Sequence, residues 1–311
     1  MRKTIRKPAP LVMTIEERKL FESYLRPDTQ VPSIKIDVGV RNTPDIFSPT
    51  SFDDYIGQEA AKDLARITVQ AALNERRALP NIMVVGEYGL GKTSLARVIM
   101  RAAKLPVVMY DGSSLNKNLP TETTFIIDEI HNLESKVADT LNLHIDSGKY
   151  HIIGCTNHPG QLPAAFRSRF RTIQLNPYTP KDLKLIAKKI CERKGVKIND
   201  GALDILSQRS RFNARQIISY LSMTFDIMSV KGYSQLTTEV VNETLGKIGV
   251  DSNGLLPRDR DYLNALPNRP VGLQFLSAIL GLDAVTIEEE VEPYLLRMGL
   301  INRGPRGRER V

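Results

Sequence analysis

One stretch decides the fold of this 311-residue chain: Asn81-Ile82-Met83-Val84-Val85-Gly86-Glu87-Tyr88-Gly89-Leu90-Gly91-Lys92-Thr93. It begins with a short apolar run, which is typical of a buried β-strand. The part from Gly86 onward fits the pattern G-x-x-x-x-G-K-[ST], and a helical pattern follows over residues 92–103. A glycine-rich turn between a strand and a helix is typical of a site that binds phosphate groups.

On either side of this stretch, strand and helix patterns alternate. A helix is predicted over residues 58–76, and apolar runs predict strands at 81–85, 107–110, 124–128, 150–155 and 172–175. Short apolar runs separated by helices indicate a parallel sheet that is covered on both faces. After Pro177 the pattern becomes helical, with helices expected at 180–194, 200–209, 213–230 and 237–247 and a linker at 251–257. Three further helices and a Gly/Arg-rich hairpin are expected beyond the linker.

The composition limits the classes of protein and partner. With 41% hydrophobic residues the chain can bury a sizeable core, and its length corresponds to about two domains. Lys and Arg number 43 against 35 Asp and Glu, and this net charge of +8 favours a polyanionic partner such as nucleic acid. No run approaches the roughly 18 apolar residues of a membrane span or resembles a signal peptide, so we expect a cytoplasmic protein. Cys155 and Cys191 cannot build a disulfide framework, and no Cys/His cluster predicts a zinc scaffold.

The glycine-rich loop predicts the chemistry of its ligand. Gly86, Gly89 and Gly91 let the backbone wrap around phosphates, so that N–H groups and the helix N-terminus face the anion. Lys92 would reach the β- and γ-phosphate oxygens, and the Thr93 hydroxyl would ligate Mg²⁺. We therefore predict a site for a nucleoside triphosphate with Mg²⁺.

Two adjacent acids, Asp128 and Glu129, end the apolar strand predicted at 124–128. They would lie at the carboxyl edge of the sheet, where open α/β sheets bind their ligands. Asp128 would hold the magnesium, and Glu129 would polarise the attacking water. On their own, two acids after a strand are equally consistent with a solvated turn, but the loop upstream favours the catalytic interpretation.

Hydrolysis also needs a group that senses the γ-phosphate and a positive charge for the transition state. Asn157 follows the strand at 150–155, and its amide can bridge water and phosphate; a turn asparagine before Pro159 is the alternative. Arg167 and Arg169 present cations on a short helix before the last strand. Without further context, both could be surface charges.

The N-terminal segment differs from the rest of the chain. It opens on a basic cluster, and Thr14 with Glu17 has the form of a capping box before an apolar stripe at helical spacing. We interpret residues 1–50 as a basic extension with one short helix. Its start could bind phosphates, but a solvated tail is the favoured interpretation.

Five motifs follow one another in the chain: Tyr55-Ile56-Gly57-Gln58, the loop at 86–93, Asp128-Glu129-Ile130-His131, Ser168-Arg169-Phe170 and Asn213-Ala214-Arg215. Their order resembles that of AAA+ ATPases, above all the bacterial RuvB family of Holliday-junction branch-migration motors. Arg269-Pro270-Val271-Gly272-Leu273 and residues 286–295 are similar to the winged helix of that family. The resemblance covers residues 48–311. It implies an α/β fold in which an AAA+ P-loop parallel-sheet domain is followed by an all-helical lid and a C-terminal winged-helix domain.

The resemblance also implies a role for each matched residue. The catalytic set would be Lys92, Glu129, Asn157 as sensor 1, Arg169 as the finger that reaches a neighbouring subunit's nucleotide, and Arg215 as sensor 2. The ATP-binding set would be Tyr55, Ile56, Gly86, Gly89, Gly91, Lys92, Thr93, Ser94 and Arg215, with Thr93 and Asp128 as the metal-binding pair. A finger that acts on a neighbour implies a ring, which in this family is a hexamer that pulls duplex DNA through its centre.

These patterns predict four parts of the chain: a basic extension (1–50), an AAA+ domain (51–177), a helical lid (178–250) and a winged helix (256–311). The segment between Asp128 and Asn157 has room for a helix, a turn and a strand. It has no room for the extra hairpin with which RuvB docks onto its junction-binding partner RuvA. The sequence therefore argues against a RuvA-like partner.

Basic side chains gather in the hairpin at the end of the winged-helix segment. They are Arg303, Arg306, Arg308 and Arg310. Glycines would let this hairpin approach the DNA backbone or a minor groove without reading sequence; a frayed basic end is the alternative. The preceding helix, expected at 287–298 with a capping box from Thr286 to Glu289, carries four glutamates, which phosphates would repel.

Three functions compete. The favoured one is an ATP-dependent motor that moves along double-stranded DNA or drives junction branch points. The second is an ATP-dependent loader or switch, of the clamp-loader or transposition-regulator type, that recruits a partner to DNA without processive movement. The third is a structural protein that binds nucleotide without turnover, and the presence of Lys92, Asp128, Glu129 and Arg169 argues against it.

Overall fold

A computed structural model describes residues 46–115 and 119–311 of the chain. The predicted N-terminal helix and most of the basic extension lie outside these residues. None of the helices in the described ranges combines the length and the apolar character that a bilayer-crossing segment needs.

Five parallel strands form the central sheet, in the order β2-β3-β4-β1-β5. They are β1 (Ile82–Val85), β2 (Met109–Asp111), β3 (Thr124–Asp128), β4 (His151–Thr156) and β5 (Arg171–Gln174). The register places Val85 beside Thr156 and Asp111 beside Asp128, so the carboxyl ends of the strands lie at one edge. Because the phosphate loop, the acid pair and Asn157 all follow strand ends, the sheet brings them to this edge.

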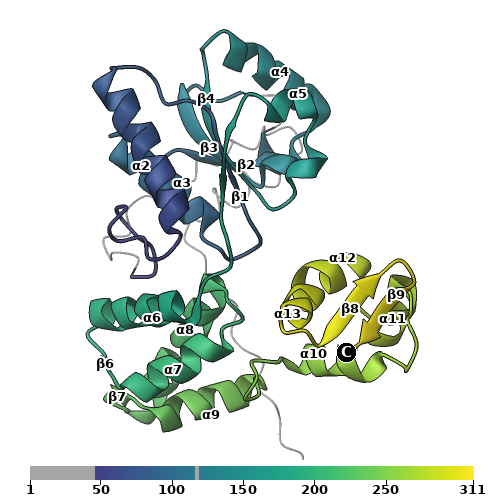
Figure 1. Cartoon of the computed structure of the whole chain (residues 1–311). Helices are drawn as coiled ribbons and strands as arrows, with labels where there is room; N and C mark the ends of the chain where they lie inside the picture. The colour runs from purple at the N-terminus through teal and green to yellow at the C-terminus, as the bar shows by residue number, and fades with distance from the viewer. Residues whose placement is uncertain (1–45, 116–118) are drawn as a thin grey trace, which may run out of the picture. The chain divides into compact units, whose positions relative to one another are not determined.

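Helices cover both faces of the sheet, as Figure 1 shows for α2 (Glu59–Asn74) and α3 (Lys92–Ala102) on one side and α4 (Ser135–Asp146) and α5 (Ala164–Arg167) on the other. The strands alternate accordingly. Ile82 and Val84 belong to the core under α2 and α3, whereas their neighbours Met83 and Val85 pack with α4. Burial of each of these aliphatic side chains contributes about 1.5–3 kcal/mol to the stability of the fold. The predicted parallel sheet with helices on both faces is therefore confirmed.

Short 3₁₀ turns shape the strand ends. They are η1 (Gly112–Ser114), η2 (Ile130–Asn132) and η3 (Pro159–Gln161). Asp111 accepts a hydrogen bond from the Ser113 N–H and so caps η1.

The segment after the sheet is helical, with α6 (Pro180–Lys194), α7 (Asp200–Arg209), α8 (Ala214–Lys231) and α9 (Thr238–Ile248). Local side chains begin these helices: Thr179 caps α6, Asn199 caps α7 and Asn213 caps α8. The expectation of an all-helical lid needs one correction. Two short parallel strands, β6 (Lys197–Ile198) and β7 (Gln235–Leu236), pair where the connections before α7 and α9 run side by side. The sequence did not predict them, because strands of two residues that pair across a long stretch of chain show no alternating hydrophobic pattern.

The C-terminal segment contains α10 (Pro257–Ala265), α11 (Leu273–Leu280), α12 (Ala284–Thr286), the π-helical turn η4 (Ile287–Val291), α13 (Glu292–Arg297) and the antiparallel hairpin β8 (Ile301–Gly304) and β9 (Gly307–Arg310). The predicted start of the third helix is wrong. Asp283 caps it by accepting from the Thr286 N–H at 2.8 Å, so Thr286 lies inside the first turn and forms no capping box with Glu289. The π turn ends beside Pro293, whose missing N–H interrupts the regular helical ladder.

Candidate nucleotide-hydrolysis site

The phosphate loop (residues 86–93) joins β1 to α3 and requires glycine at two points. Gly89 and Gly91 have φ angles of +74° and +90°, in the left-handed region that favours glycine. A Cβ at Gly89 would lie 2.1 Å from Asn213 Oδ1, and one at Gly91 would lie 2.6 Å from the Tyr55 hydroxyl. Because Gly91 has no side chain to cap α3, the first N–H groups of that helix are offered to an anion.

Lys92 is the cation of the loop. Its ammonium is buried and donates to the carbonyls of Gly86 at 2.9 Å and Glu87 at 3.1 Å. Burial lowers the pKa of Lys92, and the negative charge of Glu129 opposes this shift. Phosphate oxygens are stronger acceptors than the two carbonyls, so the ammonium is placed to exchange them for a triphosphate.

Thr93 and Asp128 meet where α3 begins and β3 ends. The Thr93 hydroxyl donates to Asp128 Oδ2 at 2.9 Å. A hydroxyl and a carboxylate are oxygen ligands that suit a hard divalent cation. These two residues are therefore the ones that could hold a metal ion here.

Glu129 adopts a left-handed backbone conformation, with φ of +47°, which turns its side chain beside the end of the sheet. Its Oε2 lies 3.4 Å from His131 Nδ1 and accepts no hydrogen bond from any described residue. Asn157 Oδ1 is likewise buried without a partner among the residues that the structure describes. Burial raises the pKa of Glu129, against the charge of Lys92, and this makes the carboxylate a stronger base. Two unsatisfied buried acceptors beside the phosphate loop fit a nucleotide and its attacking water.

Two tyrosines, Tyr55 and Tyr178, lie behind the phosphate loop. The buried Tyr55 hydroxyl donates to the carbonyls of Leu90 and Gly91 and accepts from the Tyr178 hydroxyl at 3.4 Å. A pocket is lined here by Tyr55, Ile56, Gly91, Ser94, Tyr178 and Ala214. The structure thus brings Tyr55, Ile56 and Ser94 together; Tyr178 carried no recognisable motif and was missed from the sequence.

The helical segment contributes two residues to the phosphate side. The exposed Arg215 lines a cavity together with Glu87 and Tyr88 of the phosphate loop, and its backbone N–H donates to Gly89 O at 3.3 Å. Asn213 donates from Nδ2 to Tyr88 O at 2.8 Å and also caps α8. This contact of Asn213 was not predicted, although its position just before a helix is a recognisable N-cap signal.

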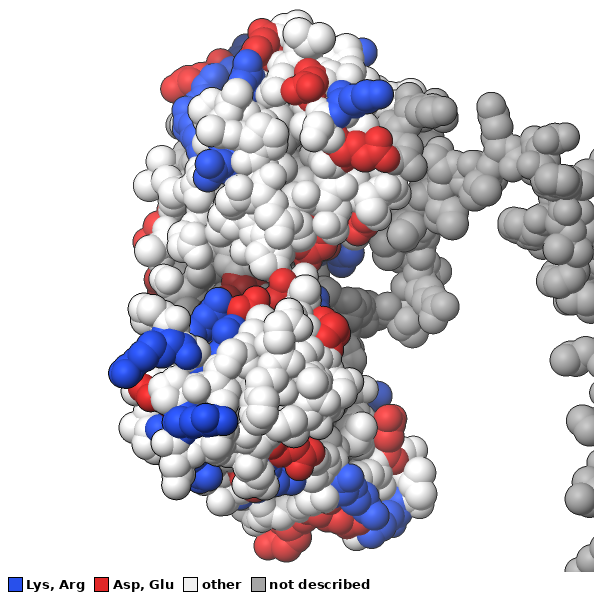
Figure 2. Space-filling view, turned by 90° about the vertical axis from the view of Figure 1, so that its right-hand side faces the viewer, with Lys and Arg blue, Asp and Glu red and all other residues white. Residues whose placement is uncertain are grey.

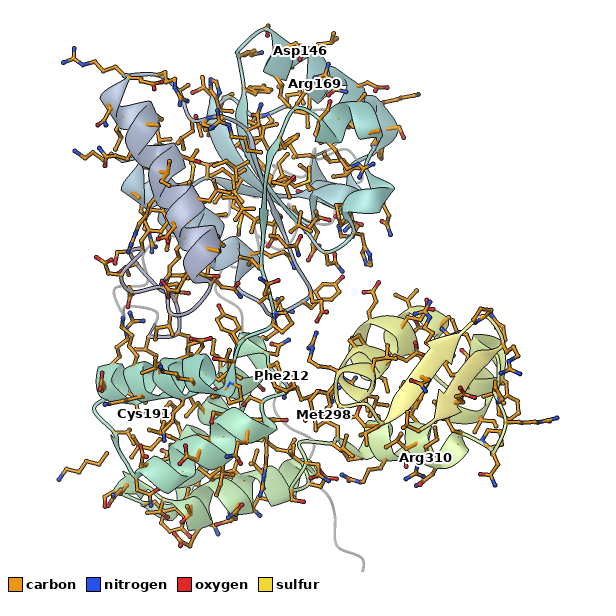
Figure 3. All side chains as sticks on the ribbon, in the orientation of Figure 1. Asp146, Arg169, Cys191, Phe212, Met298 and Arg310 are labelled. Carbon is orange, nitrogen blue, oxygen red and sulfur yellow. The ribbon has the colours of Figure 1, made fainter. Side chains whose placement is uncertain are left out.

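Arg169 is placed apart from the other predicted catalytic residues. Its guanidinium donates in a bidentate manner to Asp146, from Nε at 2.7 Å and from Nη2 at 2.6 Å. Figure 3 labels the two side chains at the ends of α4 and α5. Its hydrogen bonds within the described residues go to Asp146 and to the Ala165 carbonyl, so it does not complete the site of its own chain.

The four arginines of the hairpin are not equivalent. Arg308 is 9% exposed and donates to Glu292 at 2.8 Å and Glu288 at 2.7 Å. Arg303 also pairs with Glu288, whereas Arg306 and Arg310 are exposed. Two of the four helix glutamates, Glu288 and Glu292, thus neutralise part of the hairpin, whereas Glu289 pairs with His158 and Glu290 with Arg258. On the face shown in Figure 2, basic and acidic side chains are similarly interspersed.

The phosphate loop, the acid pair and the flanking Asn157 on a five-stranded parallel sheet, followed by a helical segment, define a P-loop ATPase of the AAA+ class. Two family models match: the Holliday junction DNA helicase RuvB P-loop domain over residues 47–146 and the RuvB C-terminal winged helix domain over residues 252–310. The chain belongs to the RuvB family.

Individual relatives agree over most of both chains. The Holliday junction branch migration complex subunit RuvB of Thermotoga petrophila is 32% identical, with 93% of this chain and 94% of the relative covered, and that of Fusobacterium nucleatum is 34% identical, with 84% and 89% covered. The solved Thermotoga maritima RuvB Holliday junction branch migration motor has a TM-score of 0.79 and 32% identity, and covers 86% of this chain and 96% of its own.

Proposed function

We propose that this chain hydrolyses ATP with Mg²⁺ at seams between copies of itself and uses the energy to drive branch migration of double-stranded DNA at Holliday junctions. Membership of the RuvB family supports the activity. The loader or switch alternative is not favoured, because the matched relatives are branch-migration subunits over nearly their whole length. The main structural support for ATP hydrolysis at this site is a cluster at one edge of the sheet, made of Lys92, Thr93, Asp128 and Glu129.

Each residue of this cluster has a separate task. Lys92 and the N-terminus of α3 bind the phosphates, while Thr93 and Asp128 hold Mg²⁺, which neutralises charge on the phosphate oxygens when bound. Glu129 orients the water and accepts its proton, and Asn157 aligns that water with the γ-phosphate. Tyr55, Ile56 and Ser94 line the pocket for the base and sugar, and Arg215 closes the phosphate side from the lid.

The placement of Arg169 supports an oligomer. Transition-state charge on the γ-phosphate requires an additional cation, and Arg169 points to Asp146 rather than to the loop of its own chain. A cation supplied by the neighbouring subunit makes the interface heterologous, and a heterologous interface forms a ring when the rotation between successive subunits closes. We therefore propose a hexameric ring in which Arg169 completes the neighbour's site.

Contacts with DNA are proposed for the hairpin of the winged helix. Arg306 and Arg310 are the exposed arginines that can reach phosphates, Arg303 is half-exposed, and Arg308 holds the hairpin in shape through Glu292. The connection between α4 and β4 spans only residues 147–150. For this reason we propose that DNA engagement does not depend on a RuvA-like protein docked at that connection.

The decisive experiment compares ATPase rates without DNA, with linear duplex and with a four-way junction, alongside the mass of the particle with a non-hydrolysable ATP analogue. Stimulation by DNA together with a particle of about six chains is expected. A single chain that hydrolyses ATP at full rate with DNA present would exclude a shared site.

A further inference from the structure

Residues 211–215 run from the connection between α7 and α8 into the first turn of α8; we call this segment the strap. Arg211 and Phe212 have φ angles of +56° and +57°, although neither is glycine. This backbone conformation is strained for such residues and persists only where its surroundings hold it in place. The contacts that hold the strap therefore identify what it connects.

On one side, the strap is anchored in the winged-helix segment. Arg211 Nη1 donates to Asp259 Oδ2 at 2.6 Å, and Nη2 donates to Glu290 O at 3.1 Å. The guanidinium lies 4.5 Å from the ring centre of Tyr294. The side chains of Arg211 and Asp259 are only 7% and 0% exposed, so this is a buried ion pair. Phe212 packs against the same core, with its ring 6.2 Å from that of Tyr294.

On the other side, the strap touches the phosphate loop. Asn213 donates from Nδ2 to Tyr88 O at 2.8 Å, and the Arg215 N–H donates to Gly89 O at 3.3 Å. The contact is close enough that even a Cβ at Gly89 would collide with Asn213. Phosphates bound by the loop must therefore act on the position of the strap.

The two charges of the Arg211–Asp259 pair depend on each other. Removing one partner leaves the other charge buried and unpaired, which is strongly destabilising, whereas an exposed pair can lose a partner at little cost. Burial raises the pKa of Asp259, and the Arg211 charge opposes this, which shows how much the carboxylate depends on its partner. The strap and α10 therefore move together.

We propose that Arg211 is a positioning residue that couples the phosphate loop to the winged helix: a nucleotide-dependent shift of Asn213 and Arg215 reaches the DNA-binding segment through the Arg211–Asp259 pair. This inference rests on the proposed function, since it supplies one link between the ATP site and the DNA-binding segment, beside the direct contacts of Arg297 with Glu87 and of Glu289 with His158. Within the described residues, the Arg211 side chain donates hydrogen bonds to Asp259 and Glu290, and to neither the phosphate loop nor the β8–β9 hairpin. Its contribution is therefore the coupling between the two sites, not the affinity of either one.

The test measures this coupling as a ratio. Duplex DNA affinity of the full-length protein is titrated with and without a non-hydrolysable ATP analogue, and the ratio of the two dissociation constants is the coupling factor. The variant is the double substitution Arg211→Met with Asp259→Asn, because it removes both charges of the buried pair together and leaves an amide oxygen to accept the Leu256 N–H, which Asp259 accepts at 2.7 Å. The matched control is Arg209→Met, which removes an arginine bonded to Asn242 within the helical segment.

For the unmodified protein and the control we expect a coupling factor of about fivefold or more. For the double variant we expect a clearly smaller factor, with ATP affinity unchanged, because the contacts Arg297–Glu87 and Glu289–His158 still join the two segments. A single Arg211→Lys substitution keeps the charge but loses the fork and the stacking on Tyr294, so its factor should lie between these values. Displacement of duplex per ATP hydrolysed should fall about tenfold in the double variant.

The two proposals fail in different ways. If the unmodified protein shows coupling but displaces no duplex, the motor function fails and the role of Arg211 stands. A factor of one in the unmodified protein, or the same factor in the folded double variant as in Arg209→Met, overturns the role of Arg211.

Discussion

In the proposed mechanism, Glu129 is the residue on which turnover depends most directly, because its buried Oε2 has no hydrogen-bond partner among the described residues and would accept the proton of the attacking water. Glu129→Gln keeps the size of the side chain but removes the base. We expect ATP affinity within about twofold of the unmodified protein and a kcat lower by a factor of about 10²–10⁴. Single-turnover hydrolysis and nucleotide titration measure the two quantities, and normal hydrolysis by this variant would remove Glu129 from its role.

The carboxylate of Asp54 should make the free energy of unfolding depend on pH in the acid range. It is 12% exposed and pairs with Lys189 at 2.6 Å and with Arg193. Burial alone raises its pKa, but hydrogen bonds from Lys189, the Thr50 N–H and Arg193 outweigh this and lower the pKa to about 2. Because the folded pKa is below the unfolded value of 3.8, the stabilisation is complete above about pH 4 and is lost as pH falls through about 2.

The size of this effect follows from the shift, up to about 2 kcal/mol at neutral pH. Denaturant unfolding of the unmodified protein and of Asp54→Asn should therefore differ by that amount at pH 7 and converge towards pH 2. A constant difference across this range would show that the ion pairs do not stabilise the folded state.

The backbone conformation of the residues that follow two of the helices can be tested by substitution. Lys104 follows α3 with a φ of +59°, and Gly195 follows α6 with a φ of +71°, so the two residues occupy the same left-handed position after a helix. Glycine is the favoured residue there. Lys104→Gly should stabilise the protein by about 0.5–1 kcal/mol, and Gly195→Ala should destabilise it by about 1 kcal/mol.

Urea midpoints of the two variants check this. A Cβ at Gly195 meets no atom within 4 Å, so a loss there reports backbone conformation and not a collision. Equal midpoints for both variants would mean that these turns relax to another conformation.

The hairpin β8–β9 contains two exposed arginines for which we propose DNA contacts, Arg306 and Arg310, and one buried arginine, Arg308, that is paired within the winged-helix segment. Replacing Arg306 and Arg310 by alanine should weaken DNA binding and reduce the slope of log affinity against log salt by about one per lost phosphate contact. Arg308→Ala should instead lower stability by up to about 3–5 kcal/mol, because the buried Glu292 loses its closest cation and keeps only the Tyr262 hydroxyl and the longer contact with Arg303. The salt series and thermal unfolding distinguish the two, and an unchanged slope in the double variant would place the DNA contact elsewhere.

Local signals explain which elements could be predicted from the sequence. The helices at 180–194 and 200–209 match because their caps and apolar spacing lie within the same few residues. The predicted start of the third winged-helix helix was wrong because Asp283 and Thr286 are both residue types that cap helices, and Asp283 is the one that caps it, by accepting the Thr286 N–H. Pairs between distant segments carry no periodic signal, and so β6 with β7, Tyr178 with Tyr55, and Arg308 with Glu292 appeared only in the structure.

At the scale of the whole molecule, the question is which residues of one copy serve the site of another. The phosphate loop, the acid pair and Asn157 meet within one chain, whereas Arg169 is paired with Asp146. The domain boundaries at 51–177, 178–250 and 256–311 remain predictions, and so does the ring. Complementation between inactive variants addresses the ring without any assumption about these boundaries.

Arg169→Ala and Glu129→Gln should each be inactive alone, but their mixture should hydrolyse ATP. A seam in the mixed ring is complete when the Arg169→Ala chain supplies Glu129 and the Glu129→Gln chain supplies Arg169. Random assembly at equal amounts yields about a quarter of such seams, and activity should recover to roughly that fraction if the sites turn over independently. The control mixes Arg169→Ala with the double variant Arg169→Ala, Glu129→Gln, which contains no intact finger and must stay inactive. ATPase rates are measured after co-assembly, with the particle mass confirmed for each mixture. Failure of the mixture to recover, in particles of normal mass, would mean that Arg169 acts within its own chain or not at all.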